Sequence, residues 1–244
     1  MLLVWDAERL FVLSEIQAHD GARVTFVRCD FDQGRGVSGS HDGRLRTWDL
    51  ETGDCAGTFD AHREIISTAV VDFDNARVVS ASDDGDMYFW HLDSRVQLAC
   101  YEGHTDRVNV IRADLERNLV VTASNDETAR IWEATSGACK GVLRGHTQGV
   151  RDVIVDWEAE EERLVITCSD DRTIRLWSFA SLECRAVLEG HENRVTMVRA
   201  RFDRAPRMMV SASTDYTLRL WNLETRDCEE ELCSHSGRVL NFIA

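Results

Sequence analysis

The sequence predicts an all-β fold, a propeller of four-stranded blades, because one stretch of it is written five times. The clearest copy runs from Gly103 to Trp132 and keeps four residues in order: a His, a Ser or Thr, an Asp and a Trp. Each Trp of the pattern is followed 14 residues later by a His, and successive Trp residues lie 42 to 45 residues apart. A repeat of this length is typical of one propeller blade.

Each complete copy keeps the same internal spacing. The Asp lies six residues before the Trp, and the Ser or Thr lies four residues before that Asp. The five sets are His19, Ser38, Asp42, Trp48; His62, Ser80, Asp84, Trp90; His104, Thr122, Asp126, Trp132; His146, Thr167, Asp171, Trp177; and His191, Ser211, Asp215, Trp221.

The strands can be placed in order along the first copy. Residues 2–5 and 10–16 are expected to be two strands, followed by a loop at Ala18 and His19 and a third strand over 23–31. Asp42-Gly43 predicts a two-residue hairpin turn, because Asp-Gly is a strong signal for one. Apolar runs such as RVVSAS and NLVVTAS predict strands that are covered on both faces.

The repeats change length in very few places. One extra residue follows His19, three lie between Trp157 and Thr167, and two lie between Phe202 and Ser211. Insertions are tolerated in loops, so these positions predict loops. The acidic run Glu158–Glu162 is interpreted as a solvated loop, with an acidic docking site as the alternative. Trp157 occupies a register that is elsewhere Phe or Leu, and we expect it in the core.

The composition describes an acidic chain with enough apolar residues for a core. Hydrophobic residues make up 43% of the 244 residues, and the net charge is −15. This charge argues against nucleic acid or an anionic membrane as a partner. No apolar run approaches the roughly 18–20 residues of a spanning helix, and the first residues lack the features of a signal peptide. We therefore expect a cytoplasmic protein, with the nucleus as the alternative.

Eight cysteines raise the question of disulfides or metal. Four of them lie seven residues before a repeat His, at one recurring strand position, so we expect small buried or half-buried side chains there. These four are Cys55, Cys139, Cys184 and Cys228. No CxxC occurs, so free thiols are favoured over zinc, and neither a metal nor a cofactor is expected.

These residues resemble the WD-repeat β-propeller family over essentially the whole chain. The recurring GH element, Ser or Thr, turn Asp and Trp stand at the family spacing, whereas the naming Trp-Asp dipeptide is kept only at Asp6 and Asp49. The resemblance implies one domain over 1–244. Its complete repeats lie at about 9–49, 52–91, 94–133, 136–178 and 181–222, with partial repeats at 1–8 and 225–244.

The resemblance also implies that each His, Ser or Thr, Asp and Trp set is a hydrogen-bonded structural tetrad. A partly buried imidazole, hydroxyl and carboxylate need partners, and they can satisfy one another. His, Ser and Asp can also mimic a hydrolase triad, but one arrangement repeated five times is not five active sites. No other catalytic pattern is visible, so no catalytic residue is predicted.

By the same resemblance, the residues around the start of each first strand lie on the top face, where family members commonly bind peptides. This face would carry five arginines: Arg23, Arg107, Arg151, Arg194 and Arg238. Guanidinium groups suit carboxylates and phosphates, so an acidic or phosphorylated peptide is the predicted ligand. The alternative is that these arginines pair with neighbouring blades, or with Asp83 and Asp170.

The predicted function is a non-catalytic scaffold or adaptor for protein partners. A substrate-recognition subunit of a ubiquitin ligase is an alternative, although Glu8 and Glu51 stand where its Trp-Asp-x-Arg motif would need Arg. An enzyme built on a propeller is the third class, and it would need a polar cluster that does not repeat.

The two ends of the chain predict an incomplete sixth blade. Residues 2–5 and 10–16 supply its third and fourth strands, and residues 238–244 supply its first, which leaves no second strand. Closure would therefore leave unpaired backbone groups near Trp5 and Val239. We expect a fragment of a longer propeller, one of seven blades, that alone forms an open or strained six-bladed ring.

Overall fold

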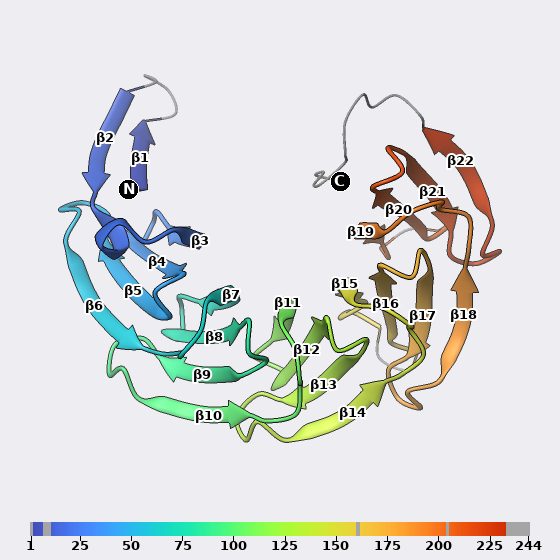
Figure 1. Ribbon diagram of the computed structural model, residues 1–244, viewed down its shortest axis with the longest axis horizontal. Coiled ribbons are helices and arrows are strands. Elements are labelled where there is room, and N and C mark those ends of the chain that lie inside the picture. Colours follow the sequence, from blue (N-terminus) through green and yellow to red (C-terminus); the bar gives the residue numbers. More distant parts are fainter. Residues whose placement is uncertain (1, 7–10, 160–161, 204, 233–244) are drawn as a thin grey trace. The chain divides into compact units, whose positions relative to one another are not determined.

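The structure is a computed structural model in which residues 2–6, 11–159, 162–203 and 205–232 are described (Figure 1). Within these residues the chain is all-β, as predicted, with 22 strands and one short 3₁₀ helix at Ala18–Gly21. No helix of the described residues is long and apolar enough to cross a membrane. Residues 238–244, on which the predicted closure depends, lie outside the described part, so closure stays a prediction.

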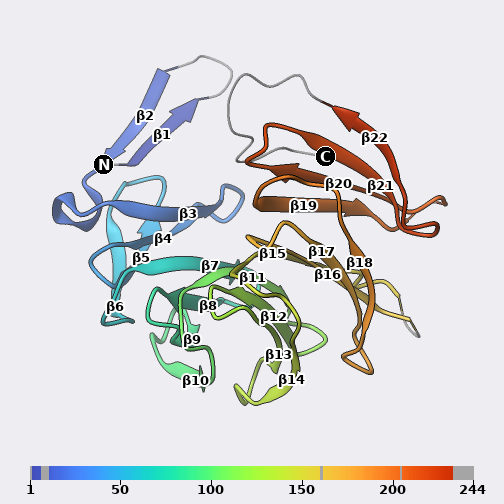
Figure 2. The ribbon, with the colours of Figure 1, turned by 45° about the vertical axis from the view of Figure 1, so that its right-hand side comes forward.

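The strands form five four-stranded antiparallel sheets and one two-stranded sheet, each with its strands in chain order (Figures 1 and 2). The two-stranded sheet pairs β1 (Leu2–Asp6) with β2 (Phe11–Ile16). The four-stranded sheets consist of β3 (Val24–Asp30), β4 (Arg35–Ser40), β5 (Arg44–Asp49) and β6 (Cys55–Asp60); β7 (Ile66–Asp72), β8 (Arg77–Ser82), β9 (Met87–His91) and β10 (Gln97–Tyr101); β11 (Val108–Asp114), β12 (Leu119–Ser124), β13 (Ala129–Glu133) and β14 (Cys139–Leu143); β15 (Val150–Val155), β16 (Leu164–Ser169), β17 (Ile174–Ser178) and β18 (Cys184–Leu188); and β19 (Val195–Arg201), β20 (Met208–Ser213), β21 (Leu218–Asn222) and β22 (Cys228–Leu232).

Burial changes across each sheet from the second strand to the fourth. In β8 every residue after Arg77 is buried, and β16 is buried throughout. This confirms the prediction that the consecutive apolar runs are strands covered on both faces. The fourth strands are more open, and β22 is exposed along its whole length.

The burial predicted for the four recurring cysteines was wrong, because they lie on these more open fourth strands. Cys55, Cys139, Cys184 and Cys228 are exposed free thiols. Each is the first residue of a fourth strand, at the outer edge of its sheet. A fourth strand has no further strand of its own sheet beside it, so the start of this strand remains accessible.

The turn between the second and third strands also differs from the prediction. In the first repeat the amide of Gly43 donates to the carbonyl of Ser40 over 3.3 Å, and Gly43 has φ of 73°. His41 and Asp42 are therefore the central residues, and Gly43 follows them in the left-handed region, as in a three-residue hairpin loop. Later repeats place non-glycine residues there with φ of 67° to 72°: Glu127, Arg172 and Tyr216.

The turn Asp explains why glycine is not required. In the fifth repeat the amide of Thr217 donates to Asp215 Oδ1 over 2.9 Å, and its hydroxyl donates to the same oxygen over 2.7 Å. These bonds hold the residues on either side of Tyr216, and so offset the roughly 1 kcal/mol cost of a left-handed L-residue.

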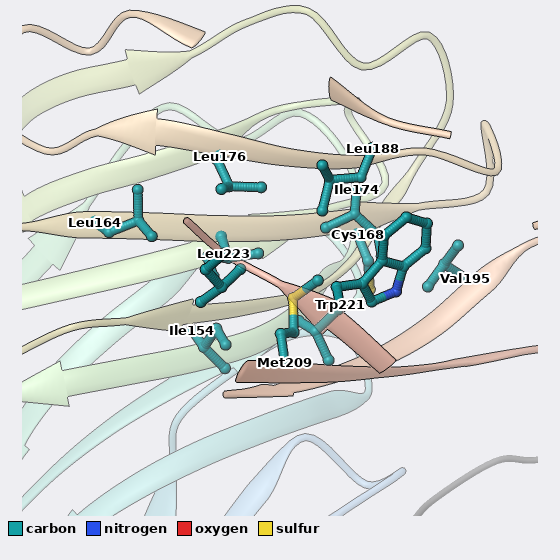
Figure 3. Close-up of a cluster of buried hydrophobic side chains, with 12 residues drawn as sticks. Ile154, Leu164, Cys168, Ile174, Leu176, Leu188, Val195, Met209, Trp221 and Leu223 are labelled. Atoms are coloured by element: carbon teal, nitrogen blue, oxygen red, sulfur yellow. The ribbon is translucent and has the colours of Figure 1, made fainter. Parts of the chain in front are cut away.

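The chain divides into two compact units. The first comprises Met1–Ile111 with Glu133–Ala138, and the second comprises Arg112–Trp132 with Cys139–Ala244. In the first unit a core cluster joins β3–β6 to β7–β9 through residues such as Phe59, Ile66 and Trp90. In the second a cluster joins β15–β18 to β19–β21, and Figure 3 shows Trp221 of this cluster with Cys168 and Val195. Each core is thus built between successive sheets.

Of the three predicted insertions, the two longer ones are loops. The one-residue insertion after His19 falls at the short 3₁₀ helix Ala18–Gly21, so the loop predicted there was wrong. The connection from β15 to β16 covers 156–163 and that from β19 to β20 covers 202–207, whereas the first three repeats have four-residue turns at 31–34, 73–76 and 115–118. Glu158 and Glu162 are exposed, in keeping with a solvated loop.

Trp157 is only half-buried, so the prediction that it lies in the core was wrong. It lies in the lengthened loop, and the guanidinium of Arg163 is 6.0 Å from its ring centroid.

Trp132 is 0% exposed, as the repeat pattern predicted. We expect Trp132→Ala to lower the free energy of unfolding by about 3–5 kcal/mol, because it leaves a cavity inside a sheet pair. Trp157→Ala, at a half-buried position, is the matched control and should cost about 1–2 kcal/mol. Urea unfolding followed by circular dichroism measures both variants, and equal losses would contradict the assignment of Trp132 to the core.

Candidate functional site

The His, Ser or Thr, Asp and Trp residues of the fifth repeat form one hydrogen-bonded chain. The Trp221 indole Nε1 donates to Ser211 Oγ over 2.8 Å, and Ser211 Oγ lies 2.7 Å from His191 Nε2. His191 Nδ1 lies 2.8 Å from Asp215 Oδ2. The chain links the loop before β19 to β20, β21 and the turn between them.

The direction of each bond follows from its donors. An indole N–H can only donate, so the Ser211 hydroxyl accepts from Trp221 and donates its own proton to His191 Nε2. His191 is then neutral, with its proton on Nδ1, where it is donated to Asp215. Burial lowers the pKa of His191, which favours this neutral form. Burial alone would raise the pKa of Asp215, but the hydrogen bonds from Thr217 and His191 outweigh it and lower the pKa to about 2.

The first and fourth repeats have the same arrangement. His19 Nε2 lies 2.7 Å from Ser38 Oγ, and Trp48 Nε1 donates to that oxygen over 2.8 Å. His19 Nδ1 lies 3.0 Å from Asp42 Oδ2. In the fourth repeat His146 lies 2.7 Å from both Thr167 Oγ1 and Asp171 Oδ2, and Trp177 donates to Thr167 over 2.8 Å.

In the third repeat the Trp132 indole donates to Thr122 Oγ1 over 2.9 Å. Asp126 accepts from the Thr128 hydroxyl over 2.6 Å, and His104 is buried. The bond from the Trp indole to the repeat hydroxyl is therefore the same as in the first, fourth and fifth repeats.

The second repeat departs from this pattern. His62 Nε2 lies 2.8 Å from Ser80 Oγ, but His62 Nδ1 and Trp90 Nε1 are buried with no hydrogen-bond partner among the described residues. Asp84 Oδ1 accepts from the amide of Asp86 over 2.9 Å. The Tyr88 ring packs on His62, with ring centroids 4.8 Å apart. Arg46, Arg130, Arg175 and Arg219 occupy the register of Tyr88 in the other repeats.

The predicted arginines that the structure describes lie at the starts of the first strands: Arg23, Arg107 and Arg194 directly precede β3, β11 and β19, and Arg151 is the second residue of β15. In the repeats of Arg23 and Arg151 a backbone bond joins this end of the first strand to the turn between the second and third strands. The amide of His41 donates to the carbonyl of Arg23 over 2.9 Å, and the amide of Asp170 donates to that of Gly149 over 3.0 Å. In the first unit Arg107 forms an ion pair with Asp83, with Nε and Oδ1 3.3 Å apart. Arg23 is exposed and forms no ion pair with the residues that the structure describes.

In the second unit two arginines share one carboxylate. Arg151 binds Asp170 through both Nε and Nη2, and Arg194 Nη1 lies 3.8 Å from Asp170 Oδ2. The side chain of Asp170 is 9% exposed, whereas that of Arg194 is 59% exposed. Arg151 is thus committed to Asp170, and Arg194 keeps most of its guanidinium open to solvent. The fifth predicted arginine, Arg238, lies outside the described residues.

A small polar pocket lies beside Arg194. Its volume is about 370 Å³, and Asn193, Arg194, Thr214 and Tyr216 line it. The amide of Thr214 donates to the carbonyl of Arg194 over 2.9 Å, which holds the two sides of the pocket together. Its lining offers a guanidinium, a carboxamide and two hydroxyl groups, which is a set suited to an oxyanion. Sequence reasoning missed Asn193 and Tyr216, because neither recurs at its register.

A second charged group was also missed. Asp152 is 3% exposed and accepts from Arg112 Nη2 over 3.0 Å and from Arg199 Nη1 over 2.8 Å. The three residues belong to β11, β15 and β19. The same register holds Phe26, Thr68, Val110 and Met197 in the other repeats, so Asp152 is its one acid. This contrast could have indicated the buried charge from the sequence. No cluster of His, Cys, Asp and Glu among the described residues could hold a metal ion.

The tetrads predict a difference between matched hydroxyl variants. Ser211→Ala removes the partner of both His191 and Trp221, so we expect it to lower the free energy of unfolding by about 2–4 kcal/mol. Ser80→Ala removes one hydrogen bond, because Trp90 does not use Ser80, and should cost about 1–2 kcal/mol. Urea denaturation of the two variants measures the difference. Equal losses would show that the Trp bond adds nothing.

His62 predicts a pH dependence of stability. Burial lowers its pKa from 6.5 to about 4 in the folded protein. Between these values the unfolded chain binds a proton that the folded chain does not, so the free energy of unfolding falls as pH falls from 6.5 to 4. The contribution of His62 is about 3 kcal/mol at most. His62→Asn should flatten this part of the stability curve relative to wild type, whereas the exposed control His41→Asn should not. Identical slopes for His62→Asn and wild type would contradict the prediction.

Comparison with known proteins identifies the repeat. The model of the family described as WD domain, G-beta repeat matches residues 11–49, 53–91, 95–133, 137–178 and 182–222. The search of curated proteins finds no match. Among solved structures the chain is similar to the computationally designed Ika8 protein, with a TM-score of 0.82 and 22% identity over 99% of this chain and 72% of that chain. This likeness shows a shared fold, and the five matched repeats show that the chain belongs to the WD domain, G-beta repeat family.

Proposed function

We propose that the chain is a non-catalytic scaffold that binds an acidic or phosphorylated peptide of a protein partner. WD domains generally mediate protein–protein interactions, and the repeats match five times along the chain. The observation that carries the narrower proposal is Arg194, an exposed guanidinium beside a pocket of about 370 Å³ lined by Asn193, Thr214 and Tyr216.

The charges around Asp170 support an anionic ligand. The guanidinium groups of Arg151 and Arg194 both face the carboxylate of Asp170. The three side chains together therefore carry a net positive charge. Because Arg151 already holds Asp170 through two bonds, a ligand carboxylate or phosphate can take Arg194 without leaving Asp170 unpaired. A charge-assisted contact of this kind contributes about 1.5–3 kcal/mol.

The other arginines have different roles in this proposal. Two of them are available for further acidic residues of a partner. Arg107 is 45% exposed although it is paired with Asp83, and Arg23 is exposed. Arg151 positions Asp170 and through it Arg194. Arg238 remains a candidate on the strength of its place in the repeat alone.

The buried tetrads support a scaffold rather than a hydrolase. The order of hydrogen bonds from Ser211 to His191 to Asp215 is that of a catalytic triad. The Ser211 hydroxyl, however, is 0% exposed and already accepts from Trp221. A nucleophile must reach its substrate, so this hydroxyl is placed for structure.

The test is the affinity for acidic peptides. We expect an Arg107→Glu, Arg194→Glu double variant to weaken binding of phosphoserine- and Glu-containing probe peptides by about tenfold or more, which is at least 1.4 kcal/mol. Binding to the wild type should also weaken as salt is raised, because exposed charges are screened. Fluorescence anisotropy with labelled peptides, and with their neutral Ser and Gln counterparts, measures both effects.

Arg185→Glu is the matched control, because Arg185 is also an exposed arginine in an ion pair, with Glu162 at 3.6 Å, but lies in β18 away from this pocket. It should leave the affinity unchanged. If the double variant binds every acidic probe as tightly as wild type, the arginines serve only to join the turns, and the proposal is wrong.

A further inference from the structure

The two lengthened loops of the second unit meet in one pocket. Its volume is about 780 Å³, and it is lined by both insertions and the strands beside them. From the first loop come Asp156, Trp157 and Glu158, and from the second come Phe202, Asp203, Ala205 and Pro206. The first three repeats have four-residue turns at these positions. The two largest length changes in the repeats thus coincide with one concave surface.

The wall of this pocket is mostly apolar. Trp157 and Phe202 face it together with Pro206, Met208 and Val210. Trp157 is half-buried, whereas Trp48, Trp90, Trp132, Trp177 and Trp221 are all buried. A partly exposed Trp within an apolar pocket is the kind of residue that dominates the energy of protein interfaces.

Among the described residues, the ion pairs around the pocket leave one carboxylate, that of Glu158, without an ion-pair partner. Arg199 binds Asp152 over 2.8 Å, Arg201 lies 3.7 Å from Asp203, and Arg207 lies 4.0 Å from Asp156. Each of these arginines therefore already has an acidic partner. Glu158 is exposed and forms no ion pair with any residue that the structure describes. Within the described part of the chain, the charge left unpaired at the mouth of the pocket is therefore negative.

We propose that this pocket binds a short segment of a partner protein in which a large apolar side chain stands next to a Lys or Arg. The apolar side chain fills the space between Trp157, Phe202 and Met208, and the basic group pairs with Glu158. This site is separate from the one proposed above and has the opposite charge preference. Arg194 directly precedes β19, and residues 202–207 follow it, so the two sites lie at opposite ends of one strand.

Three acetylated and amidated probe peptides of equal length test the proposal. They differ only at two adjacent positions, which are Phe-Lys, Phe-Glu or Ser-Lys. The readout is the indole N–H resonance of Trp157 in a proton–nitrogen correlation spectrum, assigned by its absence in Trp157→Phe. We expect the Phe-Lys peptide to shift this resonance, and to bind about tenfold more tightly than the Ser-Lys peptide, because the latter buries no aromatic ring. Its affinity should exceed that of the Phe-Glu peptide by about three- to fivefold, as expected for a partly exposed ion pair.

Variants then separate the apolar and the charged contributions. Glu158→Lys, at an exposed position, should reverse the order of the Phe-Lys and Phe-Glu peptides. Met208→Glu should abolish binding of the Phe-Lys peptide, whereas Val187→Glu should not, because Val187 is an exposed apolar residue of the same unit outside the pocket. Arg194→Glu should leave the Phe-Lys affinity unchanged, which keeps this test independent of the acidic-peptide site.

Several outcomes would overturn the proposal. Absence of a Trp157 shift with all three peptides at millimolar concentration would show that the pocket takes no such segment. An unchanged peptide order in Glu158→Lys would remove the basic group from the proposal. If sedimentation shows a dimer that Met208→Glu dissociates, the occupant is a second copy of this chain and the partner segment proposed here is wrong.

Discussion

The hydroxyl of each repeat Ser or Thr is the group on which the rest of the structure depends. In the first, fourth and fifth repeats it accepts from a Trp on the third strand and donates to a His on the loop before the first strand, as at Ser211 between Trp221 and His191. One buried oxygen therefore joins three segments far apart in sequence. A hydroxyl is well suited to this role, since it is the smallest side-chain group that both donates and accepts. The second repeat shows the consequence of a change nearby: with Tyr88 packed on His62, the Trp90 indole has lost its partner while Ser80 stays buried.

The sequence was sufficient for the strands and the repeat register, because those depend on local patterns that recur. Trp132, predicted from spacing alone, is completely buried. The wrong predictions concerned burial, which depends on where a residue lies across the sheet. The spacing of residues along the sequence does not carry this information. Cys139 recurs as regularly as Trp132, yet it begins an outermost strand and is exposed. Trp157 has the register of a core residue, but the three-residue insertion that follows places it at the edge of a pocket. Pairing of the arginines with Asp170 was named as an alternative from the sequence, and the structure shows it. The sequence did not indicate that Arg151 and Arg194 share this carboxylate and that Arg194 stays largely exposed.

The two proposed surfaces of the second unit use the same repeat in different ways. At the start of β19 the exposed Arg194 is set by a rigid turn, whose backbone is held by the bond from Thr214 to Arg194. At the other end the pocket is built from loops of unusual length, where side chains can vary without disturbing the hydroxyl network. The constant spacing within each repeat thus leaves both ends of the strands available for recognition.

The buried Asp152 has a consequence for how its neighbours lose their structure. Its carboxylate is held by Arg112 from β11 on one side and Arg199 from β19 on the other. A partly opened state that withdraws either strand removes one of the two guanidinium groups from this buried carboxylate, at a cost of about 1.5–3 kcal/mol. Repeat proteins with contacts only between neighbours can unravel one repeat at a time. A carboxylate shared among three successive repeats lowers the population of such intermediates, and so couples the unfolding of β11, β15 and β19.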